Sequence, residues 1–86
     1  MPLGYRSSTV LTVIAADPGL SNREVAEAAG VSDEGQISRL LARLQGLGLI
    51  RNRGGWHPGQ RHSWRLTTRG RRALQASTAA QAQRRN

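Results

Sequence analysis

The chain has no cysteine, no lysine and no phenylalanine among its 86 residues. Without cysteine it can form neither disulfide bonds nor Cys-ligated metal sites. No apolar run approaches the roughly 18 residues that a membrane span needs, and the first ten residues lack the apolar segment of a signal peptide. These absences lead us to expect one small, soluble, intracellular domain with no contact to a membrane.

Acidic residues are missing from the second half of the chain. All five lie between positions 17 and 34, whereas the segment from Arg51 onward contains nine arginines, and the formal net charge is +8. Such an asymmetry indicates a polyanionic partner, most often nucleic acid. A GC-rich genome would explain why every basic residue is arginine, so the argument rests on where the arginines lie.

Groups suited to catalysis or metal binding are also scarce. The two histidines, His57 and His62, lie in a glycine-rich stretch with no cysteine or acidic residue near them in the sequence. A metal site would need ligands that this stretch does not supply. The sequence also shows no nucleophile–base pairing and no phosphate-cradling loop, so we expect no enzyme activity, no cofactor and no metal.

Two short helices are expected in the first thirty residues. The apolar stripe of residues 8–16 predicts a helix that Pro18 ends. The second helix begins with an S-x-x-E capping box, in which the side chains of Ser21 and Glu24 each satisfy a backbone N–H group of the other residue. It ends at Gly30, which suits the left-handed conformation that follows many helices.

A third helix is expected over residues 32–46, with Ser32 as its N-cap. The spacing i, i+3, i+4, i+7 predicts a buried stripe made of Ile37, Leu40, Leu41, Leu44 and Leu47. The opposite face carries small and basic side chains and no acid. It contains Gly35, Gln36, Ser38, Arg39, Ala42 and Arg43.

Two short strands follow, joined by turn-forming residues. The segments LIRNR (49–53) and HSWRLT (62–67) alternate between apolar and polar positions, and GGWHPGQ (54–60) separates them. This pattern predicts a β-hairpin. Trp64 is expected in the core, because it alternates in phase with Leu66 in a chain without phenylalanine.

A last helix completes the predicted domain. Thr67 is expected to cap it, and its apolar residues extend through Leu74. We therefore divide the chain into an N-terminal arm (1–7), a domain (8–75) and an Ala/Gln/Arg-rich tail (76–86) that is helical or frayed.

This order of elements resembles the winged helix-turn-helix domain of bacterial transcriptional regulators, most closely the multiple-antibiotic-resistance (MarR) type. The run SNREVAEAAGVSDEGQISRLLARLQGLGLI (21–50) is similar to the second and third helices of that family, and LTTRGRRAL (66–74) to its closing helix. The resemblance implies a mostly helical α+β fold with a three-helix core, a two-stranded β-hairpin wing and a C-terminal helix. It further implies sequence-specific binding of double-stranded DNA, with helix 32–46 in the major groove and the 51–65 wing on the backbone or minor groove.

The residue types on these elements suit distinct roles at DNA. The fork of Arg39 matches guanine O6 and N7, and Gln36 can read adenine, so the predicted base or major-groove set is Gln36, Ser38, Arg39 and Arg43. Contacts to phosphate are expected from the start of the second helix and from the wing, with the set Ser21, Asn22, Arg23, Arg51, Arg53, Trp56, His57, Arg61 and Arg65. Trp56 either folds back on the hairpin or stacks at the DNA.

Two alternatives keep the fold and change the partner. Many winged helices dock proteins, or associate with RNA, through the same helix. The chain also resembles winged helices that bind left-handed Z-DNA, whose recognition helix uses an asparagine and a tyrosine. Ser38 and Ala42 stand at those positions here, so the aromatic contact that selects the left-handed form is absent.

The resemblance departs from the MarR type at both ends of the chain. Those regulators dimerise through long terminal helices that also frame a small-molecule pocket, whereas only about seven residues precede the first helix here. We therefore expect no small-molecule effector. The chain is expected to be a monomer, a weak homodimer through its C-terminal helix or part of a longer regulator, located in the cytoplasm and associated with the nucleoid.

Overall fold

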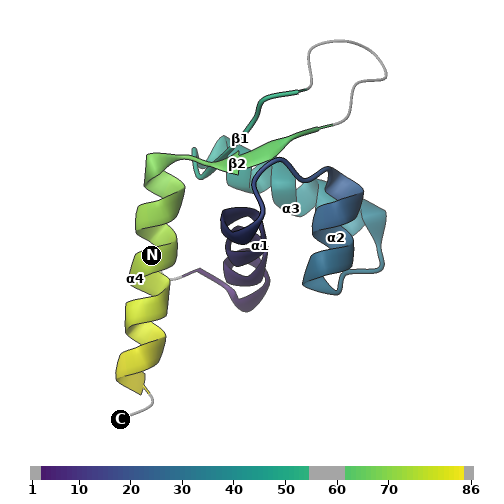
Figure 1. Ribbon diagram of the computed structural model, residues 1–86. Helices are drawn as coiled ribbons and strands as arrows, with labels where there is room; N and C mark the ends of the chain where they lie inside the picture. Colours follow the sequence, from purple (N-terminus) through teal and green to yellow (C-terminus); the bar gives the residue numbers. More distant parts are fainter. Residues whose placement is uncertain (1–2, 55–61, 85–86) are drawn as a thin grey trace.

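A computed structural model describes residues 3–54 and 62–84 (Figure 1). Within these residues, helices and a two-stranded antiparallel sheet follow one another in the order α1 (Tyr5–Ala16), α2 (Asn22–Ala29), α3 (Glu34–Gly46), β1 (Ile50–Asn52), β2 (Trp64–Leu66) and α4 (Thr68–Arg84). The mostly helical α+β fold that the sequence predicts is confirmed. Helices α1, α2 and α3 form the body of the domain, with the sheet at one edge and α4 beside α1 (Figure 1).

The first helix is longer than the apolar stripe indicates. It begins at Tyr5, so residues 5–7, which we assigned to an N-terminal arm, are helical. The added turn is polar: the Ser8 N–H group donates to the Gly4 carbonyl at 3.0 Å, and the Thr9 hydroxyl donates to the Tyr5 carbonyl at 2.9 Å. Hydrophobic periodicity cannot detect such a turn, because no apolar side chain marks it.

Helix α2 begins and ends as the sequence predicts. The Ser21 hydroxyl accepts a hydrogen bond from the Glu24 N–H group at 3.2 Å, and the Glu24 carboxylate accepts one from the Ser21 N–H group at 3.0 Å. This capping box satisfies two donors that a helix start leaves without intrahelical partners. At the other end Gly30 has φ 74°, and the helix stops there.

Helix α3 differs from the prediction at both ends. Asp33, not Ser32, is the N-cap, because its carboxylate accepts a hydrogen bond from the Gln36 N–H group at 3.2 Å. Leu47, which we predicted to be buried, is 48% exposed. It lies about 80° around the helix from Ile37, at the edge of the stripe. The chain turns at Gly48, which has φ 76°.

The sheet places apolar and charged residues on opposite faces. Ile50 pairs with Leu66, Arg51 with Arg65 and Asn52 with Trp64. Ile50 and Trp64 are buried, whereas both arginines are exposed. This alternation is the one that the sequence predicts for a half-buried hairpin.

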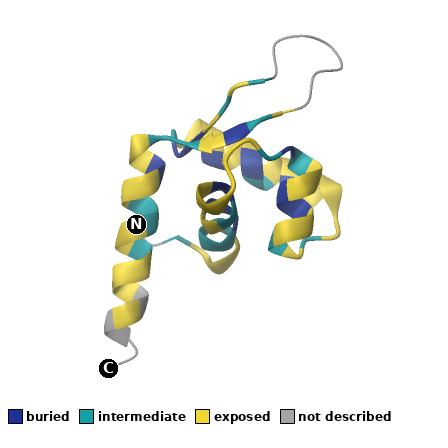
Figure 2. Cartoon of the chain, viewed as in Figure 1, coloured by how far each residue is buried: buried dark blue, intermediate teal, exposed yellow. Residues whose placement is uncertain are grey.

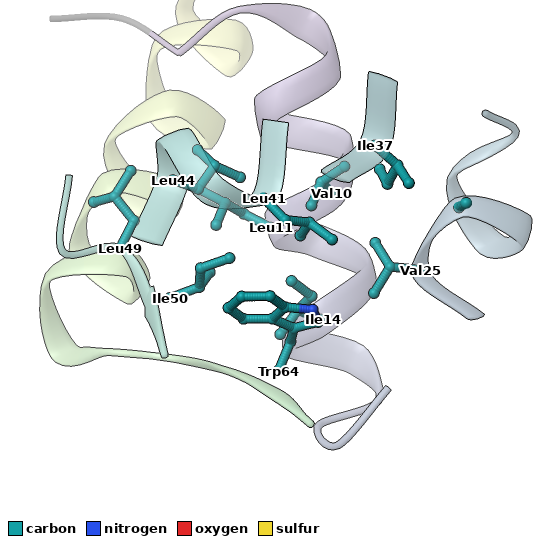
Figure 3. Close-up of a cluster of buried hydrophobic side chains, with 11 residues drawn as sticks. Val10, Leu11, Ile14, Val25, Ile37, Leu41, Leu44, Leu49, Ile50 and Trp64 are labelled. Atoms are coloured by element: carbon teal, nitrogen blue, oxygen red, sulfur yellow. The ribbon is translucent and has the colours of Figure 1, made fainter. Parts of the chain in front are cut away.

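The core lies between the three-helix body and the sheet (Figures 2 and 3). Trp64, only 3% exposed, packs there as predicted, near Ile50 and Ile14 (Figure 3). An antiparallel bridge joins it to Leu20, in which the Trp64 N–H group donates to the Leu20 carbonyl at 3.0 Å. The buried apolar residues are Val10, Leu11, Ile14, Val25, Ala26, Ile37, Leu41, Leu44, Leu49, Ile50 and Trp64.

Helix α4 begins at a close backbone contact. The Thr67 hydroxyl accepts a hydrogen bond from the Gly70 N–H group at 2.9 Å and donates one to the Gly48 carbonyl at 2.6 Å, which confirms Thr67 as the cap. The helix then continues past Leu74 to Arg84. None of the helices in the described part of the chain combines the length and the apolar character of a membrane span.

Gly70 is the residue that allows this contact. A Cβ atom at Gly70 would collide with the carbonyl oxygen of Leu49 and lie 2.9 Å from its carbonyl carbon. Both partners belong to the backbone, so no side-chain rotation can relieve the overlap. A side chain at this position would push α4 away from β1.

We therefore expect Gly70→Ala to lower the free energy of unfolding by about 3 kcal/mol or more, the upper range of overpacking effects. Gly46→Ala is the matched control, because a Cβ atom there meets nothing within 4 Å. That control should be neutral or stabilise the chain by up to about 1 kcal/mol, since alanine favours helices over glycine. Urea unfolding followed by circular dichroism measures both variants, and equal stability of the two would contradict the steric argument.

Candidate nucleic-acid interface

The outer face of α3 lies open to solvent. Every residue that we placed on it is exposed, while Ile37, Leu41 and Leu44 on the other side are buried. The exposed face comprises Gly35, Gln36, Ser38, Arg39, Ala42 and Arg43. Helix α2 packs against α3 through Val25 and Ala26, which fixes the direction of this face relative to the start of α2.

Arg39 extends toward the N-terminal end of α3. Its Nη1 atom lies 3.4 Å from the position that a Cβ atom on Gly35 would occupy, and the Asp33 carboxylate lies 3.2 Å from that position. The absence of a side chain at Gly35 therefore leaves room for the guanidinium group along the helix surface. Among the described residues, Arg23 and Glu27 form an ion pair at 3.4 Å, and no carboxylate lies at ion-pair distance from Arg39 or Arg43.

The start of α2 carries three of the predicted phosphate contacts, and the structure distinguishes them. Ser21 is 7% exposed, and its hydroxyl accepts the capping hydrogen bond. Asn22 is half-buried and accepts a hydrogen bond from the indole N–H group of Trp64 at 2.5 Å. Arg23 is exposed beside Glu27. Of the three, only Arg23 is exposed, and it is paired with Glu27, while Asn22 keeps its NH₂ group as a donor.

The wing strands present three exposed arginines. Arg51 and Arg65 lie directly opposite each other on the outer face of the sheet, and Arg53 continues β1. Like charges in such a cross-strand pair repel, and a bound anion would relieve that repulsion. The predicted contacts Trp56, His57 and Arg61 lie outside the described residues.

The base of the wing is held by bonds that the sequence did not reveal. The Asn52 side-chain oxygen accepts hydrogen bonds from the Ser63 N–H group at 2.8 Å and from the Gly54 N–H group at 3.0 Å. The exposed ring of His62 stacks on Trp64, with 5.4 Å between ring centroids. Among residues 3–54 and 62–84, no group of three His, Cys, Asp or Glu side chains could hold a metal ion.

Sequence reasoning missed a second group of arginines. Arg69 and Arg71, at the start of α4, line a hollow of about 610 Å³ together with the wing arginines. We call it the wing-base hollow; its charged lining residues are Arg51, Arg53, Arg65, Arg69 and Arg71. The signal in the sequence is the run TTRGRR (67–72), whose pattern predicts the beginning of a helix and does not show that its arginines meet the wing.

Helix α2, the turn at Gly30, helix α3 and the hairpin together form a winged helix-turn-helix domain. No family model matches the chain, and a search of curated proteins finds no match either. Solved structures show that the fold is that of MarR-type regulators. The PcaV transcriptional regulator from Streptomyces coelicolor, in complex with its natural ligand, is 30% identical, with a TM-score of 0.82 over 94% of this chain.

Two further structures agree. MepR, a transcription regulator of the Staphylococcus aureus multidrug efflux pump MepA, is 24% identical with a TM-score of 0.76 over 91% of this chain. A MarR-family protein of Mycobacterium tuberculosis, in complex with salicylic acid, is 26% identical with a TM-score of 0.70 over 90%. The chain spans 57% of the length of PcaV and MepR and 56% of the third protein.

These structures correct one expectation. We expected no small-molecule effector, because the terminal helices that frame a pocket in MarR-type regulators are not evident in this sequence. That expectation is wrong, since PcaV holds its natural ligand and the M. tuberculosis protein holds salicylic acid.

The bond between Asn22 and Trp64 yields a test of how the interface is held. Asn22→Ala would leave the indole N–H group of a buried ring without its acceptor, which should lower the free energy of unfolding by about 1–3 kcal/mol. Asn22→Asp keeps an acceptor oxygen at a helix start that favours acids, so its stability should stay near that of the natural chain. Thermal and urea unfolding measure both variants. A loss of equal size in the two would contradict a role for this hydrogen bond.

Proposed function

We propose that this chain binds double-stranded DNA as the DNA-binding domain of a transcriptional regulator. One observation carries the proposal. The outer face of α3 is exposed and free of acid from Gln36 to Arg43. It belongs to a helix that packs against α2 and β1, on a fold shared with transcriptional regulators. No catalytic role is assigned to any residue.

The physical argument for a major-groove role concerns the shape of α3. The major groove of B-form DNA is wide enough to admit an α-helix together with its side chains. Gly35 and Ala42 add little bulk to the exposed face, so the helix can approach base edges closely. Arg39 lies between them with its fork unpaired by any carboxylate in the described residues, and Gln36 stands one turn nearer the helix start.

Contacts to the backbone follow from charge. Arg23 near the start of α2 and Arg51, Arg53 and Arg65 on the wing strands are exposed. Guanidinium groups bind phosphate oxygens through paired hydrogen bonds, and such contacts set the register of a protein on duplex DNA without reading sequence. We propose these as the phosphate contacts, with Asn22 contributing its NH₂ group.

Arg39→Ala tests the base-reading part of the proposal. On a duplex selected from a random library, affinity should fall by about 1–3 kcal/mol, and discrimination should relax at one base pair. Fluorescence anisotropy on the selected duplex and its single-substitution series measures both effects. Equal losses on every duplex would make Arg39 a phosphate contact and contradict base reading.

Arg53→Ala tests the wing. Affinity should fall by a similar factor on selected and unrelated duplexes, and the slope of log affinity against log salt should decrease by about 1. Arg6→Ala is the matched control, because Arg6 is an exposed arginine on α1, beside the end of α2, and does not belong to the proposed contacts. If Arg6→Ala has the same effect as Arg53→Ala, binding depends on net charge and not on the wing.

A further inference from the structure

The residues that line the wing-base hollow lie where the sheet passes into α4 and at the C-terminal end of α1. Figure 1 shows that these elements come together at one end of the domain. The lining of the hollow comes from α1 and the turn after it, from both strands, and from the start of α4; no residue of α2 or α3 contributes among the described residues. It is therefore a different surface from the exposed face of α3. It shares only its wing arginines with the proposed DNA contacts.

The charge of the hollow is unbalanced. Five arginines line it, and no aspartate or glutamate does. Two of them, Arg51 and Arg65, are directly opposed across the strands, where like charges destabilise a sheet. Among the described residues, the ion pair within 4.0 Å is Arg23–Glu27 on α2. None of the five arginines therefore has a carboxylate partner at ion-pair distance in this part of the chain. The cluster therefore carries a positive charge that a bound anion would neutralise.

Two of the five arginines, both at the start of α4, lie against neighbouring groups. Arg71 donates to the Leu66 carbonyl at 3.5 Å and to the Thr68 hydroxyl at 3.3 Å, so its side chain folds back along the first turn of α4. The side chain of Arg69 passes over Gly48, within 3.8 Å of the position of a Cβ atom there. The contact at Gly70 that brings α4 against β1 also brings these two arginines to the wing. The hydrogen-bonded side chain of Arg71 loses less entropy on binding than an unrestrained one.

We propose that the wing-base hollow binds an anion with several closely spaced phosphate groups. Guanidinium forks match phosphate oxygens in geometry. The volume of about 610 Å³ accommodates more than one phosphate group and lies within the range of small-molecule sites. The same chemistry is offered by a free polyphosphate-bearing molecule and by the phosphates of a nucleic-acid backbone.

The proposed anion site does not depend on the proposed function, but one consequence of the site does depend on that function. Arg51, Arg53 and Arg65 line the hollow and are also the proposed phosphate contacts of the wing. A free polyphosphate in the hollow would neutralise them and weaken binding of duplex DNA. Its occupancy would thus couple a small anion to DNA affinity through shared residues.

Inorganic tripolyphosphate is the probe, and isothermal titration calorimetry at constant ionic strength is the measurement. Arg69→Gln and Arg71→Gln should each weaken binding about tenfold, the loss expected for a charge-assisted hydrogen bond. Arg72→Gln is the matched control: Arg72 is an exposed arginine on the same helix that does not line the hollow, and it should change affinity less than about twofold. An equal loss in all three variants, or natural-chain binding no tighter than that of sulfate, would overturn the proposal.

Circular dichroism melting checks that each variant is folded, and Arg69→Lys guards against a purely structural effect. Lysine keeps the charge but lacks the fork, so Arg69→Lys should bind tripolyphosphate at an affinity between those of the natural chain and Arg69→Gln. Binding as weak as that of Arg69→Gln at unchanged stability also fits the proposal. Full binding by both Arg69 variants would overturn it.

Duplex DNA then identifies the source of the phosphate. If Arg69→Gln and Arg71→Gln also weaken DNA binding while Arg72→Gln does not, the hollow holds the DNA backbone. If they leave DNA affinity unchanged and tripolyphosphate displaces DNA from the natural chain, the ligand is a free polyphosphate. Should no duplex bind at all, the proposed function fails while the calorimetric comparison still decides the hollow.

Discussion

The arrangement of this domain depends on one side chain, Trp64. It fills the core beside Ile50 and Ile14, and its backbone joins β2 to Leu20 ahead of α2. Its indole N–H group donates to Asn22 at the first turn of α2. In a chain without phenylalanine, a single tryptophan therefore connects the wing, the core and the helix-turn-helix. A large ring with one donor suits this position, because it buries much apolar area and still satisfies a polar neighbour.

The position of Trp64 also determines where the charge lies. Because side chains alternate along a strand, burying Trp64 and Ile50 places Arg65 and Arg51 together on the outer face. The contact between Gly70 and Leu49 then brings the arginines at the start of α4 to the same place. Mutual repulsion among these arginines opposes folding. A bound anion would reduce that repulsion and stabilise the folded domain. The basic half of the chain is thus organised by the apolar residues that it flanks.

Local signals in the sequence are sufficient for the fold and for the exposed face of α3, but not for contacts between distant segments. The capping box at Ser21, the turn at Gly30, the buried stripe of α3 and the inward Trp64 each follow from a short pattern with a known physical cause. The bond between Asn22 and Trp64 joins residues 42 positions apart, and no local pattern encodes it. The wing-base hollow arises in the same way, since Arg69 and Arg71 reach the pair of Arg51 and Arg65 only after α4 docks through Gly70. Leu47 was predicted to be buried from the stripe of α3, but the helix ends at Gly46 and Leu47 is exposed.

Binding of duplex DNA is the central claim, and its dependence on salt tests it most directly. Fluorescence anisotropy with a duplex of about 20–30 base pairs, the matched single strand and a structured RNA would be measured over a salt series. We expect the duplex to be preferred and log affinity to fall linearly with log salt, with a slope that reports several phosphate contacts. Failure to bind the duplex at low salt, or equal binding of all three nucleic acids, would contradict the claim. In the first case the face of α3 would be a surface for docking proteins.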